Sequence, residues 1–71
     1  MTIAEAIFAL DRRASVIYTD SYGEYGGCII TGIITRSVEK RVFALEIAKP
    51  DYAGQVRSVI VTGLDSVKLR R

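Results

Sequence analysis

Hydrophobic and polar residues alternate along most of this chain, a two-residue period that is typical of half-buried β-strands. Strands are expected over residues 14–19, 28–36, 41–48, 55–62 and 67–70. The first residues follow another pattern, because Ile3, Ile7 and Leu10 recur at the spacing of one helical face. A helix is therefore expected over residues 3–11. One helix followed by five strands with short connections predicts a single all-β domain over residues 1–71, a small barrel rather than a βαβ protein.

The start of the predicted helix carries a capping box formed by Thr2 and Glu5. In this motif the Thr2 hydroxyl accepts from the Glu5 backbone N–H, and the Glu5 side chain accepts from the Thr2 backbone N–H. Arg12 and Arg13 follow at the other end, where the helix dipole favours cations. Both ends of the helix are thus indicated by local chemistry as well as by periodicity.

Glycine and turn residues separate the predicted strands. Residues 20–23 and the pair Gly26–Gly27 indicate a turn between the first two strands. Gly32, in the middle of the second strand, indicates a bend or a close backbone approach. Gly63 precedes a tight turn before the last strand, and Gly63→Val should cost more than about 1 kcal/mol if Gly63 needs a positive φ or a close backbone approach. Asp65 is expected to cap that turn through its side chain.

The fourth predicted strand is apolar on both faces, with Val59 and Val61 on one face and Ile60 on the other. A long exposed strand of this kind favours aggregation unless something covers it. Pairing with the last strand of a neighbouring copy would cover it, and head-to-tail pairing that closes gives a ring. The residues expected in this oligomer contact are Val59, Ile60, Val61, Val67 and Leu69.

The order of an N-terminal helix, five strands and a short turn before the last strand resembles the Sm-like protein family over essentially the whole chain. In the first Sm motif a Gly in the second strand precedes an Asp and an Asn around the following loop. Gly32 matches the Gly, while Val38 and Val42 stand at the Asp and Asn positions. In the second motif an Arg-Gly pair precedes the last strand, and here the pair reads Thr62-Gly63. The apolar positions after that pair are matched by Val67 and Leu69.

The resemblance implies a strongly bent five-stranded barrel of the Sm-like or SH3-like type and a homo-oligomeric ring. It does not transfer the family's RNA site, because the residues that pocket a uridine and hold its phosphate are the ones replaced by Val38, Val42 and Thr62. Divergent Sm-like proteins of this size occur in bacteria, archaea and bacteriophages, cyanophages included. A phage or mobile-element origin is therefore compatible with the resemblance.

Composition and charge narrow the classes of protein further. The chain has 71 residues, and 49% of them are hydrophobic. A domain of this size does not readily bury so many apolar side chains in its core. Apolar surface that the domain leaves exposed is usually buried by self-association. The net charge of +2 is weak evidence for nucleic acid. The single Cys28, the lack of a signal-like leader and the lack of a long apolar run lead us to expect a soluble protein of the cytoplasm, with no membrane partner.

No combination of residues predicts catalysis, a cofactor or a metal site. The chain has no His, the commonest general base, and Cys28 begins an apolar strand without a basic partner. Cys28 is therefore read as a structural thiol and the protein as a non-enzyme. The carboxylates are scattered singly, which is unlike a metal site. The glycines of residues 23–27 lack the Gly-Lys-Ser/Thr ending of a phosphate loop and lead into a strand.

Basic and tyrosine residues supply the candidate binding site. Arg36, Lys40 and Arg41 bracket the hairpin loop around residues 37–40. Two further basic groups are Arg12 with Arg13, and Lys68 with Arg70 and Arg71. Tyr22 and Tyr25 are expected on the first hairpin loop and Tyr52 on a later one, where aromatic rings stack on bases or pack in protein interfaces.

Two functions from different classes fit these patterns. The first is a ring that binds single-stranded RNA with low sequence specificity through Arg36, Lys40, Arg41, Tyr22 and Tyr25. The second is a structural or adaptor ring that binds a protein partner and no nucleic acid. The competing interpretation is that the basic residues form an ordinary solvated surface. The carboxylates of Glu24, Glu39 and Glu46 reduce the positive electrostatic potential of that surface.

Overall fold

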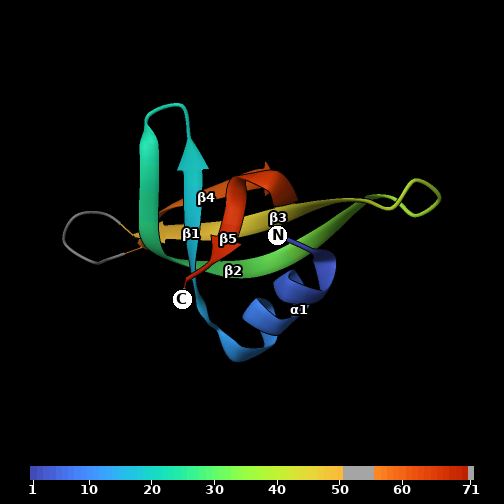
Figure 1. The fold of residues 1–71 in the computed structure, drawn as a ribbon, viewed down its shortest axis with the longest axis horizontal. Coiled ribbons are helices and arrows are strands. Elements are labelled where there is room, and N and C mark those ends of the chain that lie inside the picture. Colours follow the sequence, from blue (N-terminus) through green and yellow to red (C-terminus); the bar gives the residue numbers. More distant parts are fainter. Residues whose placement is uncertain (51–55, 71) are drawn as a thin grey trace.

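The computed structural model describes residues 1–50 and 56–70 and contains one helix and a single five-stranded antiparallel sheet (Figure 1). Its elements are α1 (Ile3–Arg12), β1 (Ser15–Asp20), β2 (Gly23–Ser37), β3 (Val42–Pro50), β4 (Val56–Gly63), the short 3₁₀ helix η1 (Leu64–Ser66) and β5 (Val67–Leu69). The predicted fold class, all-β with one N-terminal helix, is confirmed. No helix in the described residues is long and apolar enough to cross a membrane.

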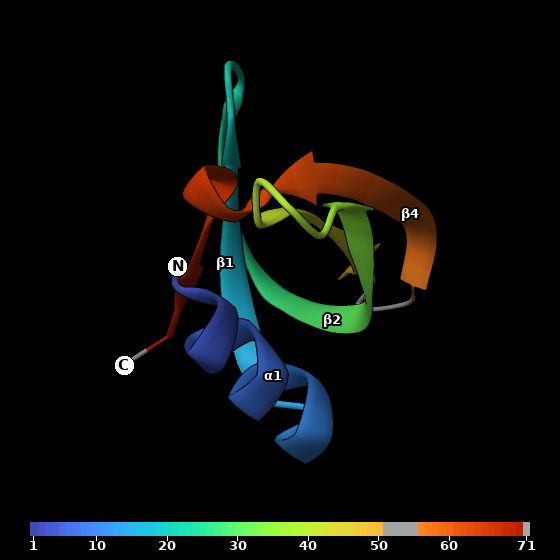
Figure 2. The same cartoon turned by 90° about the vertical axis from the view of Figure 1, so that its right-hand side faces the viewer.

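The strands lie side by side in the order β4-β3-β2-β1-β5. The sheet is strongly bent, and Figure 2 shows β2 curving around from β1 toward β4. The sheet does not close, since β4 and β5 are its two edges and are not hydrogen-bonded to each other. Among the described residues the structure is therefore an open, curved sheet with two free edges.

Helix α1 begins at the predicted capping box. The Thr2 N–H donates to Glu5 Oε1 at 2.9 Å, and the Glu5 N–H donates to Thr2 Oγ1 at 3.1 Å. At the other end Arg13 takes a left-handed conformation with φ 51°, and its N–H donates to carbonyl oxygens of the last turn. Local chemistry thus fixes both ends of the helix.

The longest strand, β2, starts at Gly23 rather than at residue 28 as expected. The turn consists of Ser21 and Tyr22, and Asp20 Oδ1 accepts from the Tyr22 backbone N–H at 2.7 Å. The prediction of a turn at Gly26–Gly27 is wrong, because these glycines lie within β2 where its pairing with β1 shifts register. Gly27 has φ 71°, so this Gly-Gly pair serves a β-bulge inside the strand.

Gly32 lies at a second irregularity of β2, where its pairing with β3 shifts register. This agrees with the predicted bend. A close backbone approach is absent, because a Cβ at Gly32 would lie 3.7 Å from the nearest atoms of Glu46, an ordinary contact. The sequence therefore located the irregularity and left its cause open.

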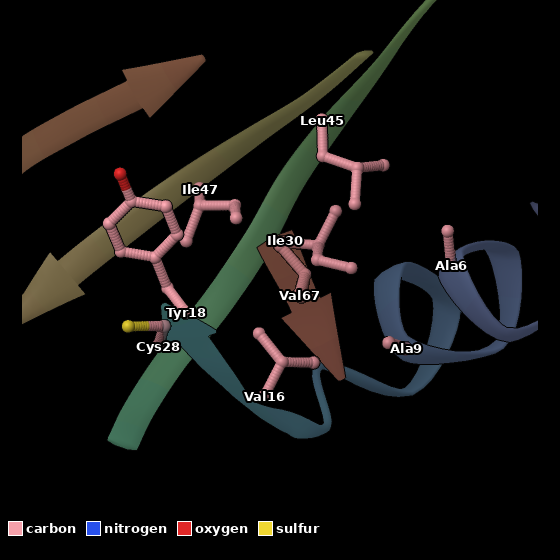
Figure 3. Close-up of a cluster of buried hydrophobic side chains, with 9 residues drawn as sticks. All are labelled: Ala6, Ala9, Val16, Tyr18, Cys28, Ile30, Leu45, Ile47 and Val67. Atoms are coloured by element: carbon pink, nitrogen blue, oxygen red, sulfur yellow. The ribbon is translucent and has the colours of Figure 1, made fainter. Parts of the chain in front are cut away.

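The core lies where α1 packs against one face of the sheet, and Figure 3 shows its side chains converging from the helix and from β1, β2, β3 and β5. The buried set consists of Ala6, Ala9, Val16, Tyr18, Cys28, Ile30, Leu45, Ile47 and Val67. Small residues on α1 let the helix pack closely against this face of the sheet. Leu10, Ile60 and Leu69 pack around the cluster and are partly buried.

The strand–turn–strand ending is present, but Gly63 meets neither of the two conditions considered for it, a positive φ or a close backbone approach. Gly63 has φ −76° and ψ 165°, an extended conformation open to any residue, and a Cβ there would meet no atom within 4 Å. The turn itself is η1, which has no side-chain cap on its first residue. Asp65 is exposed and makes no hydrogen bond within the described residues, so the predicted cap is not formed.

Replacing Gly63 with valine is therefore expected to change the free energy of unfolding by less than about 0.5 kcal/mol. The position lies at the end of β4, where a β-branched residue fits extended backbone. Thermal unfolding of Gly63→Val beside the unmodified protein measures the effect. A loss above about 1 kcal/mol would show that the chain around Gly63 is more restricted than its geometry indicates.

Candidate nucleic-acid interface

The β2–β3 hairpin ends in a cluster of cations, here called the basic tip and defined as residues 36–42. Figure 1 shows this hairpin projecting away from the rest of the sheet. Arg36, Lys40 and Arg41 are all exposed, and none of them forms an ion pair within the described part of the chain. Three of the predicted site residues are therefore brought together with their charges uncompensated by a salt bridge.

The backbone of the basic tip is irregular at both of its arginines. Arg36 lies where the pairing of β2 with β3 shifts between Thr35 and Ser37, a bulge that turns a side chain away from the regular alternation. Arg41 has φ 53°, a left-handed conformation that costs an ordinary residue roughly 1–2 kcal/mol. The local backbone thus favours glycine or asparagine at position 41, yet an arginine occupies it.

Two hydrogen bonds hold the turn of the basic tip. The Lys40 N–H donates to Ser37 Oγ at 3.3 Å, and the Arg41 N–H donates to the Val38 carbonyl at 3.3 Å. Both bonds are exposed or local to the turn, so they shape the loop without attaching it to the core. The tip is a self-supporting turn at the end of a two-stranded ribbon.

Two valines share the basic tip with the cations. Val38 is 79% exposed and Val42 is 46% exposed. These are the positions that the Sm resemblance aligns with the Asp and Asn of the RNA pocket. The structure therefore presents methyl groups to solvent where that family presents hydrogen-bonding side chains. Sequence reasoning did not include either valine in the site, although an apolar residue inside a polar turn was the available signal.

Tyr22 and Tyr25 lie at the opposite end of β2 from the basic tip. Tyr22 is exposed in the turn just before β2 begins, as predicted. Tyr25 does not lie on a loop, since it is part of β2 and only partly exposed. Its ring stacks on Tyr18 with centroids 6.0 Å apart, and Lys49 Nζ lies 3.6 Å from its centroid. Tyr25 is thus engaged within the fold, and the third predicted tyrosine, Tyr52, lies outside the described residues.

Two of the remaining described cations are engaged within the fold, whereas Arg13 and Arg70 are exposed and form no ion pair among the described residues. Lys68 pairs with Glu24 at 3.5 Å, an exposed contact of small energy. Arg12 lies over the Phe8 ring, 5.3 Å from its centroid. Arg71 lies outside the described residues. The basic tip is therefore the group in which three described cations are all exposed and without an ion pair among the described residues, which favours it as an anion-binding surface.

The two sheet edges carry the residues predicted for an oligomer contact. On β4, Val59 is 63% exposed and Val61 is 47% exposed. Ile60 packs against the core, because successive side chains of a strand face opposite sides of the sheet. On β5, Leu69 packs against the core and Val67 is only 3% exposed. Val67 is thus a core residue, and only its backbone is available at the β5 edge.

The Cys28 thiol is buried and donates to the Tyr25 carbonyl at 3.4 Å. Burial raises the pKa of Cys28, and the opposing effects of a backbone hydrogen bond with Tyr18 and of the Lys49 charge are smaller. A buried thiol with a raised pKa stays protonated at neutral pH and is a poor nucleophile. No group of three or more metal-ligating side chains occurs within residues 1–50 and 56–70.

A pocket of about 170 Å³ lies between the end of α1 and β2, lined by Leu10, Arg13, Ile29, Ile30 and Thr31. The Thr31 hydroxyl donates to Glu46 Oε1 at 2.8 Å, which places a carboxylate beside the pocket. A carboxylate there opposes the attraction of Arg13 for an anion. The pocket is therefore a weaker candidate than the basic tip.

The described geometry gathers Arg36, Lys40 and Arg41 at one end of β2 and leaves Tyr22 at the other. Val59 and Val61, the exposed residues among those predicted for the oligomer contact, lie separately, on β4. The three cations of the basic tip can attract phosphate groups electrostatically. The exposed side chains of Val38 and Val42 lie in the same turn and can make apolar contacts. Comparison of the chain with protein-family models, with curated proteins and with solved structures gave no match.

Proposed function

We propose that this chain is a divergent Sm-like protein that forms a homo-oligomeric ring and binds single-stranded RNA with low sequence specificity. The observation that carries the proposal is the basic tip, where three exposed cations lie together without an ion pair among the described residues. The proposal assigns the protein to the cytoplasm, since its single cysteine is a buried free thiol.

Support for self-assembly comes from the two free edges of the sheet. The β4 edge is eight residues long and exposes Val59 and Val61 on one face. An edge strand of this length and apolar character is a template for pairing with another chain. Pairing β4 of one copy with β5 of the next uses both edges, and repeated head-to-tail pairing closes into a ring.

Support for RNA comes from the charge of the basic tip. Guanidinium and ammonium groups bind phosphate without regard to base, and a ring would repeat the cluster once per subunit. The valines at positions 38 and 42 offer no hydrogen bond to a base edge. Affinity should therefore depend on salt more than on sequence.

The double variant Arg36→Ala with Lys40→Ala is expected to weaken binding of single-stranded RNA at least about tenfold at low salt. Loss of two phosphate contacts should also reduce the slope of log affinity against log salt by about 1.4 per tip. Fluorescence polarisation over a salt series measures both quantities.

The matched control is Lys68→Ala with Arg70→Ala, which removes the same charge from residues outside the basic tip. We expect this control to bind RNA nearly as well as the unmodified protein. Equal losses in the two double variants would show that only net charge matters. Unchanged affinity after loss of Arg36 and Lys40 would contradict the assignment of the tip.

A second candidate function is a structural or adaptor ring that binds a protein and no nucleic acid. The observation that favours it is a pair of exposed apolar side chains on α1, Ile7 and Phe8. These add to the exposed valines of β4 and resemble a protein-binding surface more than a nucleic-acid surface. Co-purification of RNA without any protein would count heavily against this alternative.

A further inference from the structure

The groups that the basic tip presents to solvent are mainly of two kinds, cations and methyl groups. Arg36, Lys40 and Arg41 are donors suited to phosphate oxygens. Ser37 Oγ already accepts the Lys40 N–H within the turn. The carboxylate of Glu39 is the one exposed acceptor side chain within residues 36–42, and its charge repels a phosphate backbone.

A protein distinguishes RNA from DNA by contacts to the ribose 2′-hydroxyl, which require a polar group placed against the sugar. The one neutral polar side chain of the basic tip, Ser37, is half-buried and held in the turn by the Lys40 N–H, so no exposed neutral polar side chain is present for that contact. The tip's exposed apolar groups, Val38 and Val42, are suited to contact with base faces or sugar carbons and have no polar atom in their side chains to distinguish one base or sugar from another. Apolar contacts of this kind also suit the thymine methyl group, which uracil lacks.

We infer that the basic tip binds single-stranded nucleic acid without distinguishing the sugar, so that single-stranded DNA is as good a ligand as RNA. The inference rests on the proposed function, because it concerns the same cations. It goes further by naming the ligand class and by giving Val38 and Val42 a role as apolar contacts to the bases. The phosphates supply the affinity, and the valines add a contact that tolerates any base.

The test compares three homopolymers of about 12 nucleotides, a length within the range that single-strand binding sites cover. Oligo(U) and oligo(dU) differ only in the sugar, and oligo(dT) adds the methyl group to oligo(dU). We expect the affinities for oligo(U) and oligo(dU) to agree within about threefold at one salt concentration. Oligo(dT) should bind at least as tightly as oligo(dU). Fluorescence polarisation with the full chain gives all three values.

A gain-of-affinity variant tests the base contact directly. Val38→Phe replaces an exposed valine by an aromatic ring, and stacking of one base on such a ring strengthens binding by about fivefold or more. The gain should be equal for the RNA and the DNA oligomers. The matched control is Ile7→Phe, which adds a ring at an exposed position on α1 and should leave both affinities unchanged.

The outcomes separate this inference from the function on which it rests. Binding of oligo(U) at least about tenfold tighter than oligo(dU) overturns the inference and leaves the proposed function standing. Absence of a gain in Val38→Phe overturns the base contact. If neither oligomer binds, both proposals fail. If neither oligomer binds while vesicles of phosphatidylserine do, the tip is a lipid-binding surface and both nucleic-acid proposals are overturned.

Discussion

Replacing Ile47 with alanine is expected to lower the free energy of unfolding by about 2–5 kcal/mol. Ile47 lies in the middle of β3 and is fully buried. It belongs to a small cluster of buried side chains, so its truncation leaves a cavity in the core. A domain of 71 residues has a total stability of roughly 4–11 kcal/mol, so this one cavity removes a large share of it. Urea unfolding followed by circular dichroism measures the loss.

The matched control is Ile7→Ala, the same chemical change at an exposed position of α1. We expect its effect to stay within about 0.5 kcal/mol, because little buried surface is lost there. Both variants need the same protein concentration, since any self-association adds to apparent stability. Equal effects at the two positions would contradict the assignment of Ile47 to the core and of Ile7 to the surface.

Replacing Val61 with lysine is expected to weaken self-association at least about tenfold, which corresponds to ~1.4 kcal/mol per contact. Charged side chains on an edge strand oppose its pairing with another chain. Lysine suits the isolated fold, because Val61 lies opposite Glu46 in the register between β3 and β4. The variant therefore separates an effect on assembly from an effect on folding. Native mass spectrometry gives the subunit number directly.

The control for Val61→Lys is Val38→Lys, since Val38 is the more exposed valine and lies away from both sheet edges. This control should keep the oligomeric state of the unmodified protein. An unmodified protein that is already monomeric would refute the ring. An oligomer that keeps its size in Val61→Lys would place the contact elsewhere on the surface.

The helix and the order of strands were predictable because each has a local cause. The capping box at Thr2 and the apolar periodicity indicate α1 locally. The predicted apolar face is only partly right, because Ile3 and Leu10 pack beside the core while Ile7 is 55% exposed and Ala6 and Ala9 are the buried residues. Alternating apolar residues specify strands in the same way, since one face of each must meet a core. The cations of the basic tip were predictable as a group for a related reason: the two ends of a hairpin loop lie close together in space.

The errors arose where a residue has more than one structural use. Gly26 and Gly27 suit a turn or a bulge equally well, and pairing of β2 with β1 decided for the bulge. A glycine before a tight turn, such as Gly63, suits special backbone geometry or ordinary extended angles, and Gly63 has the extended angles. Val67 was assigned to a surface contact, yet the curvature of the sheet turns it into the core. Pairing and curvature are long-range properties that a local pattern does not contain.

Four of the five strands join in succession through hairpins, whereas β5 pairs with β1 across about 50 residues of chain. Only three residue pairs form there, so a large loss of chain entropy is set against few contacts. Docking of β5 should therefore be a late event in folding and an early one in unfolding. Until it docks, Val16 and Tyr18 lack their cover. In the proposed ring, a neighbour that pairs with β5 would hold this last strand in place, so that folding of each subunit would be thermodynamically coupled to the presence of the next.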